Sequence, residues 1–554
     1  MVNDKLTDDK SIIANGFCSY YHSAVSNLKA TAFKLVNFTW VYRENLPGKI
    51  NTRFRFNYVS VPQIKRHLKN LKVKKSPGID NIPNKFLKDF AHELAPPICH
   101  LINVIISTST VPIDFKTGKI TPVYKSEEKD LLKNHRPITM LPVVSKIMER
   151  CMYDQLINYL ETNNLFSSRQ FGFRKRRSTE SAATLLVDNI HRAMDKSQLT
   201  GAIFIDLSKA FDTVSHSSII SKLPSYGIVQ QEKELLTDYL FNRWQYVQYK
   251  GILSSKLPVY CGVPQGSILG PLLFLLHFND AEKQLENCSI ITYADDTVIY
   301  FHDKNIDKIA DVLTKDFERL SNWLEKNELS LNLKKGKTEL MVFGTKIRLS
   351  RITDKIQIKH QFNEINSTSS YKYLGVLVDP SLNLDDHFKN VYKKASSRVR
   401  LLRKIRNNLT TDAALRIYQA YVMPTVLYCS LVNYFHQPYR QKMLEIMEKR
   451  AKNIINHQSK TFPSLNIEHE KKVCYNVRKS MENDLECFSD YFEIINHTIK
   501  TRNNSYLLRI PRVKLESSKK TFFYTGAVFY NRLPLDIRKE SMLENFVKKV
   551  KSIQ

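Results

Sequence analysis

Acidic residues stand directly after short apolar segments at two places in the sequence. Asp206 ends the apolar run 202–205, and the adjacent pair Asp295 and Asp296 lies at the tip of a predicted apolar hairpin over 289–301. Carboxylates at the ends of buried strands are costly unless a counter-charge neutralises them. Two divalent cations ~3.5–4 Å apart would do so, and such pairs also promote phosphoryl transfer. The alternative for any single aspartate is an ordinary turn residue or helix N-cap.

A loop of small residues is the third segment that could carry chemistry. It reads GVPQGSILGP over residues 262–271 and leads into the apolar run 272–276. Small residues let a sugar or a base pair approach the backbone closely. The alternative is a simple Pro/Gly turn before a helix.

The elements that would position these segments alternate between strands and helices. Strands are predicted at 118–124, 202–207, 245–250, 256–260, 338–343 and 371–378, with a strand–turn–strand unit at 289–301. Helices are predicted at 84–110, 143–162, 216–224, 230–241 and 306–327, and again beyond residue 386 to about residue 457. This order predicts an α+β fold. Residues 1–57 are expected to be a loosely organised lead-in, and residues 460–554 are basic and show no assignable pattern.

The overall composition points to a polyanionic partner. The chain has 554 residues, with 84 Lys and Arg against 54 Asp and Glu, a net charge of +30. An anionic membrane is the rival partner, but no stretch approaches the ~18 consecutive apolar residues of a membrane span. The eight cysteines contain no Cys-x-x-Cys pair. We therefore expect a protein of the cytoplasm and nucleus, with no disulfide framework and no zinc site.

Two basic tracts suit nucleic-acid binding. Residues 169–177 hold five cations interleaved with Phe171 and Phe173, which predicts backbone binding and base stacking on a single-stranded template. The cations at the end of this tract are Arg174, Lys175, Arg176 and Arg177.

The second tract, 388–409, combines an apolar stripe at helical spacing with eight cations and no acid. It predicts a helix along the minor groove of a nucleic-acid duplex, and the alternative is a merely solvated charged face. The cations expected to contact phosphates are Lys393, Lys394, Arg400 and Arg403.

Taken together, the three chemical segments resemble motifs A, B and C of reverse transcriptases. They read FIDLSKAFD at 204–212, PQGS at 264–267 and YADD at 293–296, in the family's order and separation. Four further blocks are similar to the jockey-like non-LTR (LINE-type) retrotransposons: KKSPGIDNIP at 74–83, NHRPI at 134–138, QFGFR at 170–174 and YLGV at 373–376. The resemblance covers about residues 60–455. It implies a right-hand polymerase with fingers at 58–200, palm at 201–380, thumb at 381–460 and a basic C-terminal tail at 461–554.

The resemblance also implies catalytic roles. Asp206, Asp295, Asp296 and the carbonyl of Leu207 would hold two Mg²⁺ ions, with Mn²⁺ as a possible substitute. Lys337 matches the lysine proposed to protonate pyrophosphate, although two neighbouring lysines compete for that role.

Further residues would hold the nucleotide. Phe211 matches the steric gate that selects dNTPs over NTPs, and its alternative is a core phenylalanine. Gln265 and Gly266 would lie against the incoming nucleotide. Lys125 and Arg136 would grip the triphosphate, as a point charge and a bidentate fork, and their alternative is a solvated surface cation.

The implied function is an RNA-directed DNA polymerase that extends a primer 3′-hydroxyl with dNTPs. Its expected partners are an RNA template, a DNA primer or target and dNTPs, with no membrane. Two alternatives remain: an RNA-dependent RNA polymerase, against which Phe211 and the PQGS loop count, and a catalytically silent RNA-binding protein.

Some features depart from the family pattern. A 57-residue lead-in cannot hold the usual endonuclease, so that activity would come from elsewhere or be missing by truncation. No Cys/His zinc knuckle is present, His216 lacks the acid that commonly precedes it, and His277 replaces a usual aromatic residue.

Overall fold

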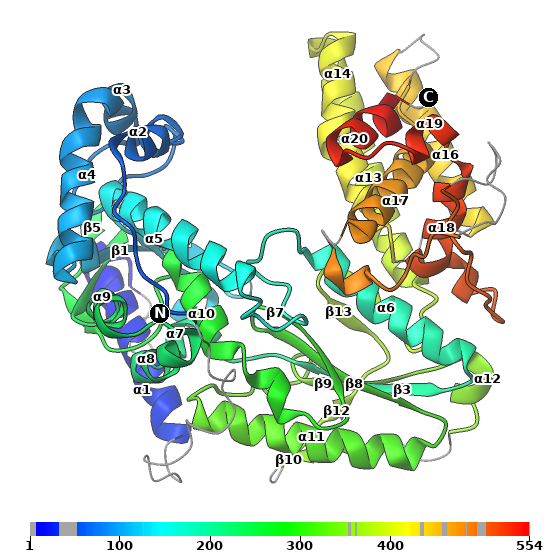
Figure 1. Cartoon of the computed structure of the whole chain (residues 1–554), viewed down its shortest axis with the longest axis horizontal. Helices are drawn as coiled ribbons and strands as arrows, with labels where there is room; N and C mark the ends of the chain where they lie inside the picture. The colour runs from blue at the N-terminus through cyan, green and yellow to red at the C-terminus, as the bar shows by residue number, and fades with distance from the viewer. Residues whose placement is uncertain are drawn as a thin grey trace. The chain divides into compact units, whose positions relative to one another are not determined.

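The computed structural model describes residues 7–32, 52–125, 127–352, 356–360, 363–432, 437–456, 462–482, 485–495 and 506–552. Figure 1 shows helices and strands interleaved along the chain, and the α+β class predicted from the sequence is confirmed. The chain divides into two compact units. Unit 1 comprises Met1–Ser167, Leu207–Glu286 and Glu318–Asn332, and unit 2 comprises Ser168–Asp206, Asn287–Phe317 and Leu333–Gln554. No helix in the described ranges is long and apolar enough to cross a membrane.

A five-stranded sheet organises unit 1, in the order β2-β1-β4-β5 with β6 paired to β4. The strands are β1 (Thr117–Tyr124), β2 (His135–Met140), β4 (Arg243–Tyr249), β5 (Ile252–Leu253) and β6 (Leu257–Val259). β1 and β2 form an antiparallel hairpin in which Val123 pairs with Arg136, while β1 runs parallel to β4. The sequence predicted most of these strands to within two or three residues.

The described part of unit 1 also contains helices. They are α1 (Lys10–Ala32), α2 (Val61–Lys69), α3 (Asn84–Asp89), α4 (Ala91–Thr108), α5 (Val143–Thr162), α7 (Ala210–Thr213), α8 (His216–Lys222), α9 (Gln230–Leu240) and α10 (Leu269–Phe278). Of these, α1 packs against β4, β5 and β6. The helix predicted at 84–110 is interrupted at Phe90, which is the C-cap of α3 and the N-cap of α4. Part of the expected loose lead-in is the regular helix α1, whose Phe17, Cys18 and Tyr21 form a small core with Ile120 and Val247.

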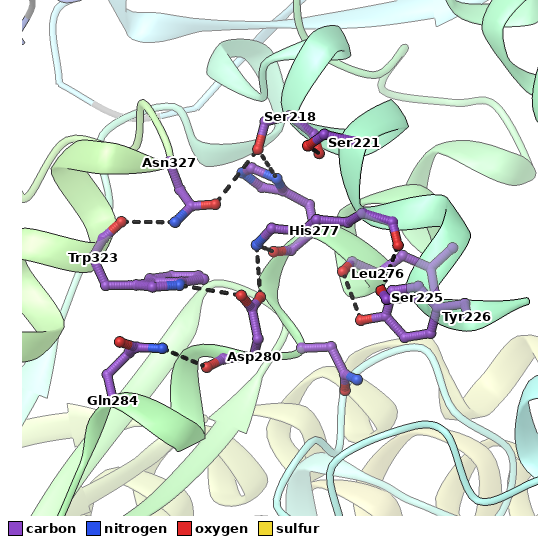
Figure 2. Close-up of polar contacts among 12 residues, drawn as sticks. Ser218, Ser221, Ser225, Tyr226, Leu276, His277, Asp280, Gln284, Trp323 and Asn327 are labelled. Carbon is purple, nitrogen blue, oxygen red and sulfur yellow. Dashed lines mark hydrogen bonds and ion pairs between the residues drawn. The ribbon is translucent and has the colours of Figure 1, made fainter. Parts of the chain in front are cut away.

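A buried polar network joins α8 and α10 to Trp323 at the end of α11 (Ile306–Lys326), a helix that begins in unit 2 and ends in unit 1 (Figure 2). The Lys222 ammonium, 1% exposed at its side chain, donates to the Asp280 carboxylate at 2.6 Å and to the His277 carbonyl at 2.7 Å. The Trp323 indole donates to the same carboxylate at 3.3 Å. A buried lysine is tolerated only when paired in this way, so the network stabilises the helices that follow the FIDLSKAFD and PQGS segments.

His277, which replaces a usual aromatic residue, and His216, which follows Ser215 where an acid is commoner, both have partners in unit 1. The ring Nδ1 of His277 lies 3.2 Å from the Ser218 hydroxyl, as Figure 2 shows. His216 donates through Nε2 to the Gly262 carbonyl at 2.7 Å. These substitutions are therefore accommodated by hydrogen bonds within the unit.

A second five-stranded sheet forms the centre of unit 2, in the order β12-β9-β3-β8-β7. The strands are β3 (Leu199–Ile205), β7 (Ser289–Tyr293), β8 (Asp296–Asp303), β9 (Glu339–Phe343) and β12 (Asn366–Ser367). β3 is buried along its whole length between β8 and β9, which fits its largely apolar sequence. The sheet packs against α6 (Thr179–Asp195), a helix that the sequence pattern did not predict.

The rest of unit 2 is largely helical. After β13 (Tyr371–Tyr373) and β14 (Val376–Val378) come α13 (Asp385–Ile405), α14 (Thr411–Ile417), α15 (Met423–Leu427), α16 (Pro438–Ile455), α17 (Leu465–Met481), α18 (Phe522–Arg532), α19 (Leu535–Arg538) and α20 (Leu543–Ser552). Shorter elements are α12 (Lys346–Leu349), β10 (Lys359–His360) and β11 (Asn363–Glu364). Residues beyond 461, for which no element was predicted, thus contain α17 to α20.

The segment beyond 461 is attached to α6 by specific contacts. The buried carboxylate of Asp188 accepts hydrogen bonds from the backbone N–H groups of Phe522 at 3.3 Å and Phe523 at 3.0 Å. Lys472 pairs with Glu180 at 2.7 Å. These contacts make the C-terminal helices a folded part of unit 2.

Candidate active site

Three aspartates meet at one edge of the unit 2 sheet. β7 and β8 are joined by a two-residue turn, Ala294 and Asp295, and Asp296 begins β8 opposite Tyr293. Ile205, the last residue of β3, pairs with Thr297 of β8. The antiparallel register therefore continues from this pair to place Asp206 opposite Asp296.

The electrostatics of unit 2 show that the three carboxylates interact. Burial, together with the negative charges of Asp295 and Asp206, raises the pKa of Asp296 to about 6, while the positive charge of Lys337 acts in the opposite direction. The Lys337 ammonium lies 3.6 Å from the Asp206 carboxylate. The Asp206 backbone N–H donates to the Thr338 hydroxyl at 3.3 Å. The segment that leads into β9 thus supplies both a cation and a backbone anchor for the acids.

The donor set suits hard divalent cations. Clustered carboxylates whose mutual repulsion raises a pKa are stabilised by a bound cation, and oxygen donors are what Mg²⁺ prefers. No group of three or more His, Cys, Asp or Glu side chains within the described ranges is preassembled to hold a metal ion. The type of ligand atom therefore suits a divalent cation, but the carboxylates would have to move closer together to bind one.

The QFGFR block holds the turn that carries Asp295 in place through hydrogen bonds. The buried Gln170 side chain accepts hydrogen bonds from the N–H groups of Ala294 at 3.0 Å and Gly172 at 2.8 Å. A Cβ on Gly172 would lie 2.4 Å from the Ala294 nitrogen, so the close approach needs glycine. Gln170 is a positioning residue that the sequence analysis missed, because its partner lies 124 residues away in the chain.

The basic tract 169–177 is used differently from the sequence prediction. Phe171 is fully buried, so its ring is not available to stack on a base. The Arg177 side chain is 6% exposed, lies over the Phe171 ring and pairs with Glu486 at 2.8 Å. Both side chains therefore make contacts within unit 2, and a nucleic-acid role for Arg177 stays a prediction. Lys175 and Arg176 are exposed, Phe173 is 44% exposed and Arg174 is half-buried.

The PQGS loop lies against β2 in unit 1. The Thr139 N–H donates to the Gln265 carbonyl at 2.8 Å. Gly266 has φ +127°, and a Cβ there would lie 2.4 Å from the Thr139 carbonyl oxygen, so only glycine fits. The Gln265 amide donates to the Asp212 carboxylate at 2.7 Å. Burial raises the pKa of Asp212 to about 6, although Gln265 and Lys209 act against this.

A cavity of about 160 Å³ adjoins this loop within unit 1. Its lining includes Thr139, Asp212, Trp244 and Gln265. Phe211 is not among the described residues that line it. The Phe211 ring is half-buried and stacks on Phe274 of α10, with centroids 4.4 Å apart. That position is compatible with both of its sequence interpretations.

The remaining cations lie on two exposed surfaces, one in each unit. Lys125 and Arg136 are exposed at the same end of the β1–β2 hairpin, where the Lys125 N–H donates to the Asn134 carbonyl at 2.9 Å. On α13 in unit 2, the apolar stripe is buried and the four predicted phosphate-binding cations are exposed. They are Lys393, Lys394, Arg400 and Arg403. Leu207, which follows Asp206 and begins unit 1, is buried and bridges to Leu331.

Comparison with known proteins gives a consistent result. The family described as reverse transcriptase (RNA-dependent DNA polymerase) matches residues 124–378. The chain is 28% identical over 418 residues to a probable RNA-directed DNA polymerase from transposon BS of Drosophila melanogaster, covering 72% of this chain and 44% of that protein. It is 26% identical over 411 residues to the RNA-directed DNA polymerase from mobile element jockey of Drosophila funebris, with coverage of 72% and 44%.

A third relative is the probable RNA-directed DNA polymerase from transposon X-element of Drosophila melanogaster. It is 28% identical over 368 residues, covering 64% of this chain and 39% of that protein. The chain thus spans less than half the length of these relatives.

Proposed function

Because this chain carries a reverse transcriptase domain related to the jockey, BS and X-element non-LTR retrotransposon polymerases, we propose that it is an RNA-directed DNA polymerase of such an element. It extends a primer 3′-hydroxyl with dNTPs on an RNA template. The observation that carries this proposal is the cluster of Asp206, Asp295 and Asp296, whose charges act on one another at the edge of a buried sheet.

The proposed architecture is a right hand. Fingers span about 58–200, palm 201–380 and thumb 381–460, and the helices of 461–554 follow. The strand order of the unit 2 sheet, with β3 between β8 and β9, supports the palm assignment because it brings the FIDLSKAFD and YADD segments to one edge.

The proposed metal ligands are Asp206, Asp295, Asp296 and the Leu207 carbonyl. Two Mg²⁺ ions, or Mn²⁺ in their place, would lower the pKa of the primer hydroxyl and neutralise the triphosphate. Lys337 lies 3.6 Å from the Asp206 carboxylate. Its ammonium carries a proton beside the acids, which suits it to protonate the departing pyrophosphate.

Nucleotide selection is assigned to unit 1. Gln265 and Gly266 lie against the incoming nucleotide, and Asp212 holds the Gln265 amide in place. Phe211 excludes a 2′-hydroxyl by filling the space it needs. Lys125 and Arg136, exposed at one end of the β1–β2 hairpin, bind the triphosphate.

Nucleic acid is bound by positively charged surfaces. Arg174, Lys175 and Arg176 contact the template, and the exposed cations of α13 follow the phosphates of the hybrid. The partners are an RNA template, a DNA primer or target and dNTPs, and we propose the cytoplasm and nucleus as the site of action.

Primer extension on poly(rA)/oligo(dT) with dTTP and Mg²⁺ tests the proposal. Extension that prefers dTTP over UTP supports it, and a preference for UTP indicates an RNA polymerase. Tight hybrid binding without extension indicates a silent binding protein. Asp295→Asn is the inactive comparison, and Asp303→Asn, which changes an acid at the opposite end of β8, is the matched control.

A further inference from the structure

The helix α1 lies outside the matched segment 124–378, yet it is part of the core of unit 1. Phe17, Cys18 and Tyr21 are buried against Ile120 of β1 and Val247 of β4. These two strands also belong to the sheet that carries the β1–β2 hairpin. The helix is therefore fixed on the same sheet as the proposed triphosphate-binding cations.

A half-buried tyrosine on α1 contacts the segment that carries Phe211 and Asp212. The Lys209 ammonium donates to the Tyr20 hydroxyl at 3.1 Å and lies 4.4 Å above the Tyr20 ring. Lys209 has φ +52°, and its carbonyl accepts the Asp212 N–H at 2.8 Å. A left-handed conformation is uncommon for a residue with a Cβ and persists where its surroundings hold it. The contact with Tyr20 helps to keep Lys209 in this conformation.

The next two residues of α1 line the cavity beside Gln265. Burial raises the pKa of Tyr21 above its ordinary value, and the negative charge of Asp212 adds to that effect. His22 Nδ1 lies 3.1 Å from the Pro258 carbonyl, and its ring contacts Tyr260 with centroids 5.9 Å apart. Tyr21 and His22 therefore form one wall of the cavity.

We propose that α1 belongs to the nucleotide-binding half of the polymerase. Tyr20 acts through Lys209 to position the turn that carries Phe211 and Asp212. Tyr21 and His22 form one wall of the cavity beside Gln265. The ligand is a deoxynucleoside triphosphate, so the inference rests on the proposed function. Tyr20 is a positioning residue, since it acts through Lys209.

Tyr20 can be separated from the general packing of α1. It is only half-buried, whereas Phe17, Cys18 and Tyr21 supply the apolar contacts. Tyr20→Phe removes the hydroxyl that accepts from Lys209 but keeps the ring under the ammonium. Tyr20→Ala removes both contacts. The matched control is Tyr58→Ala, because Tyr58 is 67% exposed in unit 1 and does not line the cavity.

The first test measures kcat and KM for dTTP and UTP with these variants. Tyr20→Ala should raise the KM for dTTP by about 10-fold with little change in kcat, and should raise UTP use relative to dTTP; Tyr20→Phe should fall between. Lys209→Met added to Tyr20→Ala should cause little further loss, because the two side chains act as one unit. A uniform loss of kcat for both nucleotides, or values equal to those of Tyr58→Ala, would overturn the proposal.

The second test does not depend on catalysis. Cys261 lines the same cavity and is half-buried, as are Cys288 and Cys487 in unit 2. His22→Ala should make N-ethylmaleimide label Cys261 at least about 5-fold faster, measured by mass spectrometry of the full chain, while labelling of Cys288 and Cys487 stays unchanged.

The two tests fail separately. Unchanged Cys261 labelling in His22→Ala contradicts the wall formed by α1 even if the unaltered chain extends primers. Absence of extension by the unaltered chain contradicts the proposed function, and faster labelling would still support α1 as the wall of the cavity.

Discussion

The acidic edge of unit 2 and the cavity of unit 1 each contain an aspartate whose pKa is raised to about 6, with burial as the largest cause: Asp296 and Asp212. They differ in their neighbours. Asp296 is close to two further carboxylates, whose charges contribute to this rise in its pKa. Asp212 accepts a hydrogen bond from Gln265 and faces Lys209, which both act in the opposite direction. A raised pKa alone therefore does not indicate a metal site. The two regions differ in whether further carboxylates lie close to the buried aspartate.

This difference suggests a division of labour. The unit 2 acids would govern the rate of bond formation, and the unit 1 residues would govern which nucleotide is chosen. Substitutions in the two regions should then affect different measurements.

The largest effect is expected for Asp295→Asn in unit 2. Loss of one carboxylate should lower primer extension by several orders of magnitude while the UTP-to-dTTP preference and hybrid affinity remain nearly unchanged. Single-nucleotide extension and filter binding measure these quantities. Near-normal extension by this variant would contradict the catalytic role proposed for the three aspartates.

The second prediction concerns binding, which belongs to neither region. Changing the four exposed α13 cations, Lys393, Lys394, Arg400 and Arg403, to Ala should flatten the salt dependence of hybrid affinity by up to ~3–4 units of log slope. The reason is that each cation that contacts a phosphate releases a counterion. Titrations at several salt concentrations measure the slope, and an unchanged slope would show that this face is merely solvated.

The third prediction tests selection in unit 1. Phe211→Ala should raise UTP use relative to dTTP by at least ~10-fold, about 1.4 kcal/mol, because the ring no longer excludes a 2′-hydroxyl. Extension with dTTP should fall much less than for Asp295→Asn. The measurement is kcat/KM for both nucleotides on one template. If the ratio does not move, Phe211 is a core residue that stacks on Phe274.

The smallest effect is expected for Asp188, a buried aspartate outside both regions. Burial raises its pKa to about 7, although the N–H groups of Phe523 and Phe522 and the charge of Arg192 oppose this. Its ionised form is penalised in the folded state, so stability should fall as pH rises from about 4 to about 7 and then level off.

Asp188→Asn cannot ionise and should flatten this dependence without changing nucleotide choice. The melting temperature at about pH 5 and about pH 8 measures it, with an expected difference of a few degrees between the variant and the unaltered chain. An identical pH dependence in both proteins would mean that the carboxylate does not ionise in this range.

The sequence by itself determined most elements around the chemistry. The helix α5 begins and ends where the apolar periodicity predicted, at Val143 and Thr162, and the three aspartates stand at strand ends as expected. These features are local. Apolar residues that recur at helical or strand spacing, bounded by polar residues, specify an element and its ends.

Only the tertiary structure decided which polar residues are internal. α6 was missed because buried Asp188 and His191 interrupt its apolar pattern, and Asp188 is satisfied by residues more than 330 positions later. Gln170 and Arg177 likewise find their partners far along the chain, at Ala294 and Glu486. A polar group can be buried only when a hydrogen-bond partner is brought to it, and the fold, not the local pattern, supplies that partner.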